Sequence, residues 1–338
     1  MKRPNGLALP SILLALIASA LAAQAQPKIA VLARVPAARE MAVCGNTLYV
    51  GTLGSAVYAV PIGGGRAKVV ARDFVTPNGV ACSGHRLFVA SRDRITAFDI
   101  GPGGALSARK VVRSDLPNLA HHGLRYIRVG PDGRLYVSLG SPCNICLPKG
   151  LQGTIVSMNQ DGSDLKRVAT GVRNSVGFDW RGKTLFFTDN GADNMGDNIP
   201  PDELNEVVRP GAFYGFPYFG GRIRLKGFES ATPPQTQTPP VFEFQAHVAT
   251  LGLLFYRGAA FPDLRGDALV AEHGSWNRTV PVGRQVVVVR FQGGRPAGVQ
   301  TFVRGVGRPV DVKQAPDGAI LVSNDAGGAI YRITNGQH

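Results

Sequence analysis

The chain has 338 residues, a formal net charge of +14 and an isoelectric point near 10.1. Its 43 glycines and 24 prolines favour many turns and short strands, so the composition predicts an all-β protein. The basic residues are scattered singly and no aromatic platform is interleaved with them, which argues against a nucleic-acid partner. A membrane surface, an acidic polymer or a small polycarboxylate would suit this charge better.

The first 25 residues have the pattern of a secretory signal peptide. Lys2 and Arg3 precede an apolar run over residues 7–23, and residues 23–25 have the A-x-A form of a cleavage site. We therefore expect a periplasmic or secreted protein whose mature chain spans residues 26–338. The run is short for a membrane span, so a retained anchor is the alternative. No other segment predicts stable membrane insertion.

Four cysteines in an exported chain indicate disulfides. Cys143 and Cys146 lie in SPCNIC, and no second CxxC or nearby histidine completes a zinc site, so we predict a local disulfide between them. Cys44 and Cys82 occupy matching places in two successive repeats. Their pairing stays open, because four cysteines permit three connectivities.

One hairpin pattern recurs six times along the chain. Each copy is an apolar strand, a polar turn and a second strand that ends in a small or polar residue. The copies recur at intervals of about 40 to 50 residues, apart from one longer interval. Their second strands contain Leu48, Leu87, Leu135, Leu185, Leu269 and Ile320.

A further strand pair follows each hairpin, which gives four strands per unit. This pattern predicts a six-bladed β-propeller of four-stranded antiparallel blades, formed by residues 26–338 as a single domain. The long interval predicts a surface insertion at about residues 213–245, which is rich in proline, threonine and glutamine. A TIM barrel would need helices between its strands, and no convincing amphipathic helix lies outside the signal peptide.

In a four-stranded blade, the entry to the first strand and the loop between the second and third strands emerge on the same face. The chemically distinctive residues fall in these two kinds of connection, so we expect a ring of them around one mouth of the channel. The entries include Arg39-Glu40, Pro77-Asn78, His121-His122, Arg173-Asn174 and Arg308; the loops include SPCNIC, DNGADNMGDN and EHGSWNR.

The loop after Thr188 holds five acidic residues within fifteen positions: Asp189, Asp193, Asp197, Asp202 and Glu203. A hard cation such as Ca²⁺ would relieve their repulsion. The spacing does not fit an EF-hand, because no glycine and late glutamate follow at the required offsets. A solvated acidic loop is the alternative interpretation of this segment.

Basic residues and histidines are expected at the same mouth. His121 and His122 precede a strand, and because strand neighbours point to opposite faces we expect only one of them to face the channel. Arg125, Arg173 and Arg308 would repel one another unless acidic groups or a bound polycarboxylate compensated them. Trp276 is interpreted either as a rim aromatic for a sugar or as a packing residue.

Several segments resemble the glucose/sorbosone dehydrogenase family, the soluble quinoprotein sugar dehydrogenases that use pyrroloquinoline quinone (PQQ). They are HHGLRYIRVGPDGRLYVSLGSPCNIC, GVRNSVGFDWRGKTLFFTDNGADNMGDNIPPDELNEV, YGFPYFGG, AEHGSWNR and GRPVDVKQAPDGAILVSNDAGG. The resemblance covers most of the mature chain in order. It is strongest to the sorbosone dehydrogenase-like branch, which shares the CNxC loop.

The resemblance implies roles for particular residues. His122 matches the catalytic histidine and would act as a general base. Arg173 and Asn174 match a pair that contacts the quinone, and Arg173 would also stabilise charge on it. Gly191 and Ala192 match carbonyl ligands of a Ca²⁺ ion that bridges to PQQ. Arg308 matches an arginine that holds a PQQ carboxylate, and Arg125 lies near enough to assist.

The chain also departs from the family pattern. His121 stands where the relatives have an acidic residue, and the lysine expected near the cofactor has no clear counterpart around HGSWNR. The implied reaction is oxidation of a small sugar or aldehyde, with electrons passed to an acceptor such as a cytochrome or quinone. A calcium-dependent lactonase and a non-catalytic binding propeller are the alternatives.

Overall fold

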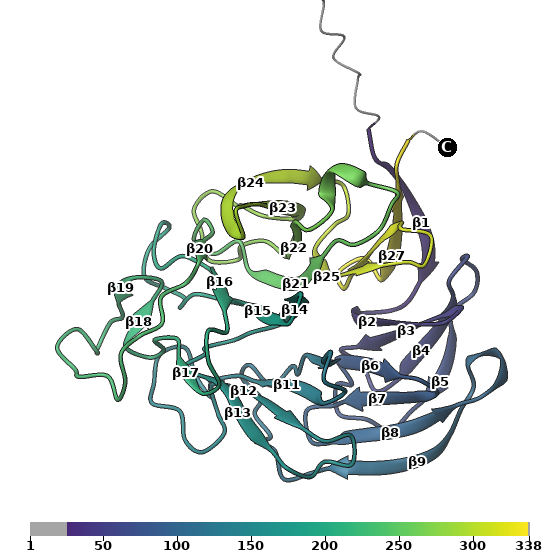
Figure 1. Ribbon diagram of the computed structural model, residues 1–338, viewed down its shortest axis with the longest axis horizontal. Helices are drawn as coiled ribbons and strands as arrows, with labels where there is room; N and C mark the ends of the chain where they lie inside the picture. The colour runs from purple at the N-terminus through teal and green to yellow at the C-terminus, as the bar shows by residue number, and fades with distance from the viewer. Residues whose placement is uncertain (1–25, 337–338) are drawn as a thin grey trace, which may run out of the picture.

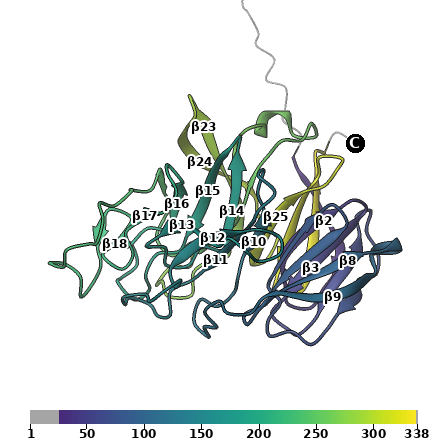
Figure 2. The same ribbon diagram turned by 60° about the horizontal axis from the view of Figure 1, so that its bottom comes forward.

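Six small antiparallel sheets are arranged around a central channel in the computed structural model, which describes residues 26–336 (Figures 1 and 2). The predicted six-bladed β-propeller is therefore confirmed. The six aliphatic residues of the repeated hairpin all lie in the second strand of their blades and are buried. The predicted signal peptide lies outside the described residues. Within residues 26–336, no helix is long and apolar enough to cross a membrane.

The first three blades follow one another along the chain, with the innermost strand first in each. Their strands are β2 (Ala38–Cys44), β3 (Thr47–Thr52), β4 (Val57–Pro61) and β5 (Lys68–Ala71); β6 (Gly79–Ser83), β7 (Arg86–Ala90), β8 (Ile95–Ile100) and β9 (Leu106–Arg113); and β10 (Ile127–Val129), β11 (Leu135–Leu139), β12 (Thr154–Met158) and β13 (Lys166–Thr170). A 3₁₀ turn, η1 (Pro102–Gly104), separates β8 from β9.

The last three blades complete the ring. Their strands are β14 (Gly177–Arg181), β15 (Thr184–Asp189), β16 (Glu203–Glu206) and β20 (Phe242–Glu243); β21 (Thr250–Phe255), β22 (Ala268–Glu272), β23 (Gln285–Gln292) and β24 (Arg295–Val303); and β25 (Pro309–Gln314), β26 (Ile320–Asn324), β27 (Ala329–Thr334) and β1 (Lys28–Arg34). A second 3₁₀ turn, η2 (Pro262–Leu264), lies between β21 and β22.

The ring is closed by strands from the two ends of the described chain. β1 is the outermost strand of the sixth blade and pairs antiparallel with β27, with Lys28 opposite Thr334 and Arg34 opposite Ala329. The two strands lie side by side in Figure 1. The last blade is therefore built from both ends of the chain, so the circle of blades has no free seam.

The apolar core is divided among the junctions between neighbouring blades. One buried cluster joins the fifth and sixth blades through Leu254, Leu269 and Val322, and corresponding clusters fill the other junctions. Because each blade buries both of its faces, its central strands are apolar on both sides instead of alternating. This arrangement leaves the channel wall free to carry polar residues.

Paired charges lie along the channel between the inner strands. Asp311 on β25 accepts from the backbone N–H of Met41 at 2.8 Å, and its two oxygens accept from Lys313 Nζ at 2.6 and 2.5 Å. Asp179 on β14 accepts from the N–H of Phe255 at 2.7 Å and pairs with Arg128 at 2.9 Å. Each carboxylate thus joins two blades and neutralises a cation inside the channel.

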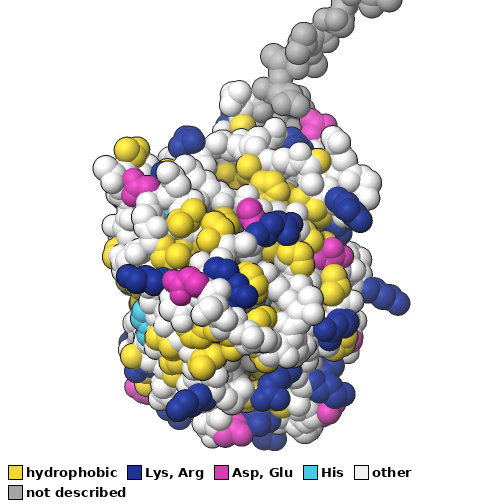
Figure 3. Space-filling model, turned by 90° about the vertical axis from the view of Figure 1, so that its left-hand side faces the viewer, with side chains coloured by type: hydrophobic (Ala, Val, Ile, Leu, Met, Phe, Trp, Pro, Cys, Tyr) yellow, Lys and Arg dark blue, Asp and Glu magenta, His cyan; other side chains and the backbone are white. Residues whose placement is uncertain are grey.

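An insertion interrupts the fourth blade between β16 and β20. It contributes β17 (Ala212–Phe213), which pairs in parallel with β13 of the third blade, and a hairpin of β18 (Phe219–Gly220) and β19 (Ile223–Arg224). The side of the molecule that carries this hairpin shows hydrophobic side chains among scattered basic ones (Figure 3). The insertion between β16 and β20 covers residues 207–241, whereas the sequence pattern predicts it at about residues 213–245.

We expect Asp311→Ala to lower the free energy of unfolding by about 3–5 kcal/mol, because it leaves the buried Lys313 ammonium without its carboxylate partner. Urea unfolding of both proteins measures the difference. Asp317→Ala is the matched control: Asp317 pairs with Arg332 on the surface, where an ion pair contributes about 0–1 kcal/mol. Equal losses in the two variants would contradict the role of Asp311.

Candidate functional site

A cavity of about 270 Å³ opens at one mouth of the channel, where loops of the third, fourth and fifth blades meet. Its lining includes both histidines of the HH pair, the Arg-Asn pair, residues of the acidic loop and the HGSWNR loop. The lining residues are His121, His122, Arg173, Asn174, Asn190, Gly191, Asp193, Asp202, His247, Ala249, Trp276 and Asn277. The ring of distinctive residues predicted from the blade topology is thus partly gathered into one cavity.

The two histidines lie in a turn, and the strand begins only at Ile127. The premise that strand alternation lets one of them face the channel is therefore wrong: both line the cavity, with ring centroids 3.9 Å apart. His122 has a positive φ of 50°, in the left-handed region that residues other than glycine rarely adopt. The turn packs tightly, since a Cβ at Gly140 would lie 2.4 Å from the His122 carbonyl oxygen.

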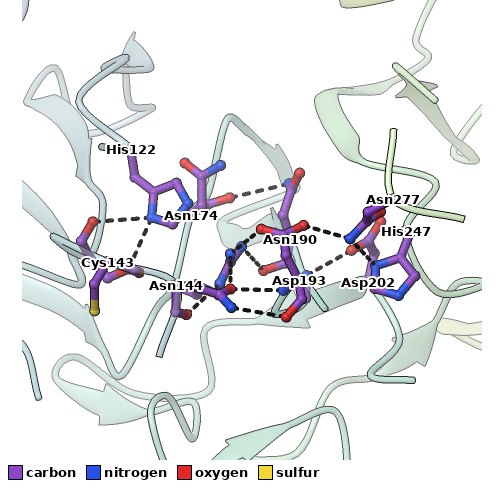
Figure 4. Close-up of polar contacts among 12 residues, drawn as sticks. His122, Cys143, Asn144, Asn174, Asn190, Asp193, Asp202, His247 and Asn277 are labelled. Carbon is purple, nitrogen blue, oxygen red and sulfur yellow. Dashed lines mark hydrogen bonds and ion pairs between the residues drawn. The ribbon is translucent and has the colours of Figure 1, made fainter. Parts of the chain in front are cut away.

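Hydrogen bonds fix the ring of His122 (Figure 4). Its Nδ1 lies 3.1 Å from the carbonyl oxygen and 3.0 Å from Oγ of Ser141, and Ser141 Oγ itself donates to the carbonyl of Cys143 at 2.8 Å. Because two acceptors face Nδ1, the proton resides on Nδ1 and the lone pair on Nε2. That lone pair is what a general base needs.

The electrostatic surroundings keep His122 neutral. Burial, the Arg173 guanidinium and His121 together lower the pKa of His122 to about 2, while the bond to Ser141 raises it. A neutral imidazole can accept a proton, but a pKa this low makes it a weak base. An anion bound in the cavity would raise the pKa toward the value at which proton transfer is efficient.

Arg173 is buried and almost fully engaged by the protein. Its Nε and Nη2 donate to the carbonyl and Oδ1 of Asn144 at 3.0 and 2.7 Å, its Nη1 donates to Asn190 O at 3.2 Å, and its Nη2 also donates to Asp193 at 2.7 Å. A guanidinium has five N–H donors, and these four bonds leave one for a ligand. The position of the cation is thus set before any ligand binds.

The acidic loop is held by carboxylates that accept backbone N–H groups. Asp189 accepts from Arg173 N at 2.8 Å and Asn174 N at 2.6 Å, and Asp202 accepts from Gly191 N at 2.7 Å and Ala249 N at 2.6 Å. Burial raises the pKa of Asp202 to about 6. Two of the five acidic residues therefore brace the loop from below, which differs from a solvated acidic loop.

The remaining acidic residues have separate partners. Glu203 is buried and accepts from the N–H of Gly221 at 2.5 Å, and burial raises the pKa of its carboxyl. Asp193 accepts from Arg173 and, at 3.0 Å, from Asn277. Asp197 accepts from Thr279 N at 3.0 Å. Within residues 26–336, no group of three or more His, Cys, Asp and Glu side chains is arranged to hold a metal ion.

Backbone carbonyls remain as candidate cation ligands. Gly191 lines the cavity and Ala192 is buried beside it. Among the hydrogen bonds of the described residues, none is accepted by the carbonyl oxygens of these two residues. A hard cation prefers oxygen ligands of this kind.

Two predicted cofactor arginines do not line the cavity. Arg125 donates to the carbonyl oxygens of Arg92 and Pro117 at 2.6 and 2.8 Å, so it anchors the loop before β10. Arg308 donates to Gly274 O at 2.9 Å and lies 3.3 Å from Nδ1 of His273, within the same mouth. These carbonyl groups hold the Arg125 guanidinium against the loop, so Arg125 is not among the residues proposed to bind the cofactor.

His247 lines the cavity although no sequence pattern pointed to it, and Asn277 was expected there only as part of the EHGSWNR loop. His247 is buried, has a positive φ of 66°, and its Nε2 lies 2.8 Å from Gly196 O (Figure 4). It lies in the connection that enters β21, as the HH and Arg-Asn pairs lie in the connections that enter β10 and β14. Its place before the first strand of a blade could have marked it as a candidate, but the preceding insertion hides where that blade begins in the sequence. Trp276 is exposed and lines the cavity, as expected for a rim aromatic.

Two disulfides join the four cysteines of the described residues. Cys143 is bonded to Cys146, as predicted, and Cys44 is bonded to Cys82, which settles the pairing that the sequence left open. The first closes a small ring at the cavity. The second joins the ends of β2 and β6, and its Cys82 lines a separate cavity of about 280 Å³ among the inner strands.

One known protein family matches most of this chain. The sequence signature of the glucose/sorbosone dehydrogenases matches residues 91–332. The chain belongs to the glucose/sorbosone dehydrogenase family. An uncharacterized protein of Borreliella burgdorferi is 40% identical over 232 residues, which are 64% of this chain and 61% of that protein. The matched part of this family member thus spans less than two thirds of that relative.

Solved structures share the fold of this glucose/sorbosone dehydrogenase family member. The holo PQQ domain of pyranose dehydrogenase from Coprinopsis cinerea has a TM-score of 0.77 and 20% identity, covering 92% of this chain and 97% of that one. The calcium structure of a Trichoderma reesei family AA12 enzyme has a TM-score of 0.78 and 19% identity, covering 91% of this chain and 95% of that one. PQQ-bound aldose sugar dehydrogenase from Streptomyces coelicolor has a TM-score of 0.67 and 21% identity, covering 92% of this chain and 98% of that one.

We predict that acid destabilises the wild-type protein relative to His122→Ala. The folded-state pKa of His122 is depressed to about 2, so the unfolded chain binds the extra proton between about pH 6.5 and pH 2. Stability therefore falls as pH decreases through that window, by up to about 1.4 kcal/mol per pH unit, and not above it. Urea unfolding at pH 5 and pH 8 without PQQ measures this. Parallel pH dependences in the two proteins would contradict it.

Proposed function

We propose that this protein is a PQQ- and calcium-dependent sugar dehydrogenase that oxidises an aldose or a related aldehyde. The observation that carries the proposal is the convergence in one cavity of a neutral histidine with a free Nε2, a fixed guanidinium and an exposed indole. Membership of the glucose/sorbosone dehydrogenase family and the PQQ-bound structures of the same fold support it.

The residues of the cavity suit PQQ, a planar tricarboxylate ortho-quinone. Arg173 offers a cation and one N–H, Asn174 and Asn277 offer amides, and Trp276 offers an aromatic face. Arg308 lies at the same mouth, beside His273 and Gly274. It is a further candidate to bind a carboxylate of PQQ. The carbonyls of Gly191 and Ala192 would hold Ca²⁺, and Asp202 fixes the loop that presents them.

The protein's part in the reaction is to position and to move a proton. Bound PQQ with Ca²⁺ supplies an electrophilic carbonyl that accepts a hydride. His122 Nε2 takes the proton from the sugar hydroxyl or aldehyde hydrate, while Ser141 holds Nδ1–H and so fixes the tautomer. Arg173 places positive charge beside the cavity, where negative charge develops on the acceptor. The electrons then leave to an external cytochrome or quinone.

No specific observation favours a lactonase. That activity would need carboxylate and asparagine side chains from several blades around one metal, and within residues 26–336 no group of three or more His, Cys, Asp and Glu side chains is arranged to hold one. A non-catalytic binding propeller would not require the ordered tautomer of His122.

Titration of the purified protein with PQQ and Ca²⁺, followed by absorbance, tests the cofactor assignment. We expect a bound-quinone spectrum and reduction of a dye by one or more aldoses. Removal of Ca²⁺ with a chelator should abolish both PQQ binding and activity, because the carbonyls of Gly191 and Ala192 would hold an ion that the bound quinone requires. Unchanged PQQ affinity in excess chelator would contradict the calcium role, and lactone hydrolysis with metal alone would contradict the dehydrogenase.

Substitution of the two histidines tests the base. We expect His122→Ala to lower turnover by about 10²- to 10⁴-fold with PQQ still bound, because it removes the proton acceptor. His121→Ala is the matched control and should have a clearly smaller effect, since among the described hydrogen bonds none fixes its ring as Ser141 fixes that of His122. Steady-state kinetics at saturating PQQ measures both. A larger loss in His121→Ala would reverse the assignment.

A further inference from the structure

The loop between β11 and β12 contains a ring closed by the Cys143–Cys146 disulfide, and Asn144 lies inside it. This asparagine joins the third blade to the acidic loop of the fourth. Its Oδ1 accepts from Arg173 Nη2 at 2.7 Å and from Asp193 N at 2.8 Å, its Nδ2 donates to Asp193 O at 2.9 Å, and its carbonyl accepts from Arg173 Nε at 3.0 Å.

These four bonds set the positions of both members of an ion pair. Asp193 binds the Arg173 guanidinium through its side chain while its backbone is held on both sides by the Asn144 amide (Figure 4). An amide suits this place because it offers a donor and an acceptor without adding charge. An aspartate there would add a second carboxylate beside Asp193, and an alanine would leave only the backbone bond to Arg173.

The same ring reaches His122. The carbonyl of Cys143 accepts from Ser141 Oγ, which in turn lies 3.0 Å from Nδ1 of His122. The N–H of Ser141 donates to the carbonyl of Arg173 at 2.8 Å. The candidate base and the candidate cofactor cation are therefore both tied to one short segment, Ser141 to Asn144.

A covalent ring limits the conformations that this segment can adopt. The disulfide spans three positions in the sequence, so it restricts the loop locally and has little to do with long-range closure of the chain. With the bond intact, the amide of Asn144 is preorganised to receive Arg173 and Asp193. With the bond broken, the loop must lose conformational entropy each time these contacts form.

We propose that Asn144 is a positioning residue for Arg173 and Asp193, and that the Cys143–Cys146 bond makes this positioning depend on oxidation. The proposal rests on the proposed function for its effect on PQQ. Arg173 keeps a single N–H for a ligand, and the direction of that N–H is set by the bonds that Asn144 makes. Loss of the amide or of the ring should therefore weaken PQQ binding without unfolding the propeller.

PQQ dissociation constants in saturating Ca²⁺, measured by fluorescence titration, test the effect on the cofactor. We expect Asn144→Ala and the double variant Cys143→Ser/Cys146→Ser each to raise the dissociation constant by about 10- to 100-fold, as for residues that orient a binding group. The matched control is Cys44→Ser/Cys82→Ser, which removes the other disulfide, away from the cavity, and should bind PQQ as the wild type does. Circular dichroism checks that all four proteins are folded.

Turnover at saturating PQQ separates the role of Asn144 from the role of the Cys143–Cys146 bond. Asn144→Ala should then keep only the deficit that comes from the displaced Arg173, since the Ser141–His122 contact remains. The double variant should show a larger deficit, because the opened ring also releases the contact between Cys143 and Ser141. If the double variant does not fold, selective reduction of Cys143–Cys146 in the folded wild type replaces it.

Labelling of arginine without PQQ tests the positioning by itself. In the wild type the Arg173 side chain is only 4% exposed, so phenylglyoxal should modify it slowly, and Asn144→Ala should accelerate that modification in mass-spectrometric peptide maps. Wild-type labelling rates and PQQ affinity in Asn144→Ala would overturn the proposal, as would equal effects of the two disulfide pairs. A wild-type protein that does not bind PQQ would refute the proposed function, while the labelling would still decide the role of Asn144.

Discussion

The pairing of β1 with β27 is the constraint on which the rest of the architecture depends. A propeller blade buries both faces against its neighbours, so an open circle would expose two apolar sheet faces to water. Because the first described strand completes the last blade, the two ends of the ring are joined by a ladder of backbone hydrogen bonds. Six blades held in a closed circle also fix the distances across the channel mouth, which no single blade could do.

Closure of the ring brings polar residues of the inner strands into contact between neighbouring blades. Asp311 and Asp179 each accept a backbone N–H from a neighbouring blade and pair with a cation in the channel. A carboxylate buried in this way is costly unless it is fully bonded, and both residues satisfy that condition. These matched charges lie along the channel, and the loops of three blades surround the cavity at its mouth.

At that mouth, the same device organises the candidate site. Asp189 and Asp202 accept two backbone N–H groups each, so the loop that carries Gly191 and Ala192 is held in place by carboxylates already engaged by the backbone. Arg173 is neutralised by Asp193 and oriented by Asn144, while His122 is oriented by Ser141. The groups available to a substrate are few, and each is supported by a neighbour that has no exposed role, as preorganised sites require.

The sequence by itself determined the six-bladed architecture and the face that carries the site, because apolar hairpins recur with blade spacing and the distinctive residues fall in two kinds of loop. It also determined the Cys143–Cys146 bond, since two cysteines three positions apart reach each other through local chain geometry. Only the tertiary structure decided which residues meet. Arg125 anchors a loop away from the cavity, His121 and His122 share it because they lie in a turn, and His247 enters it from beyond the insertion. Those outcomes depend on contacts between blades, and the side-chain periodicity of a single strand carries no information about them.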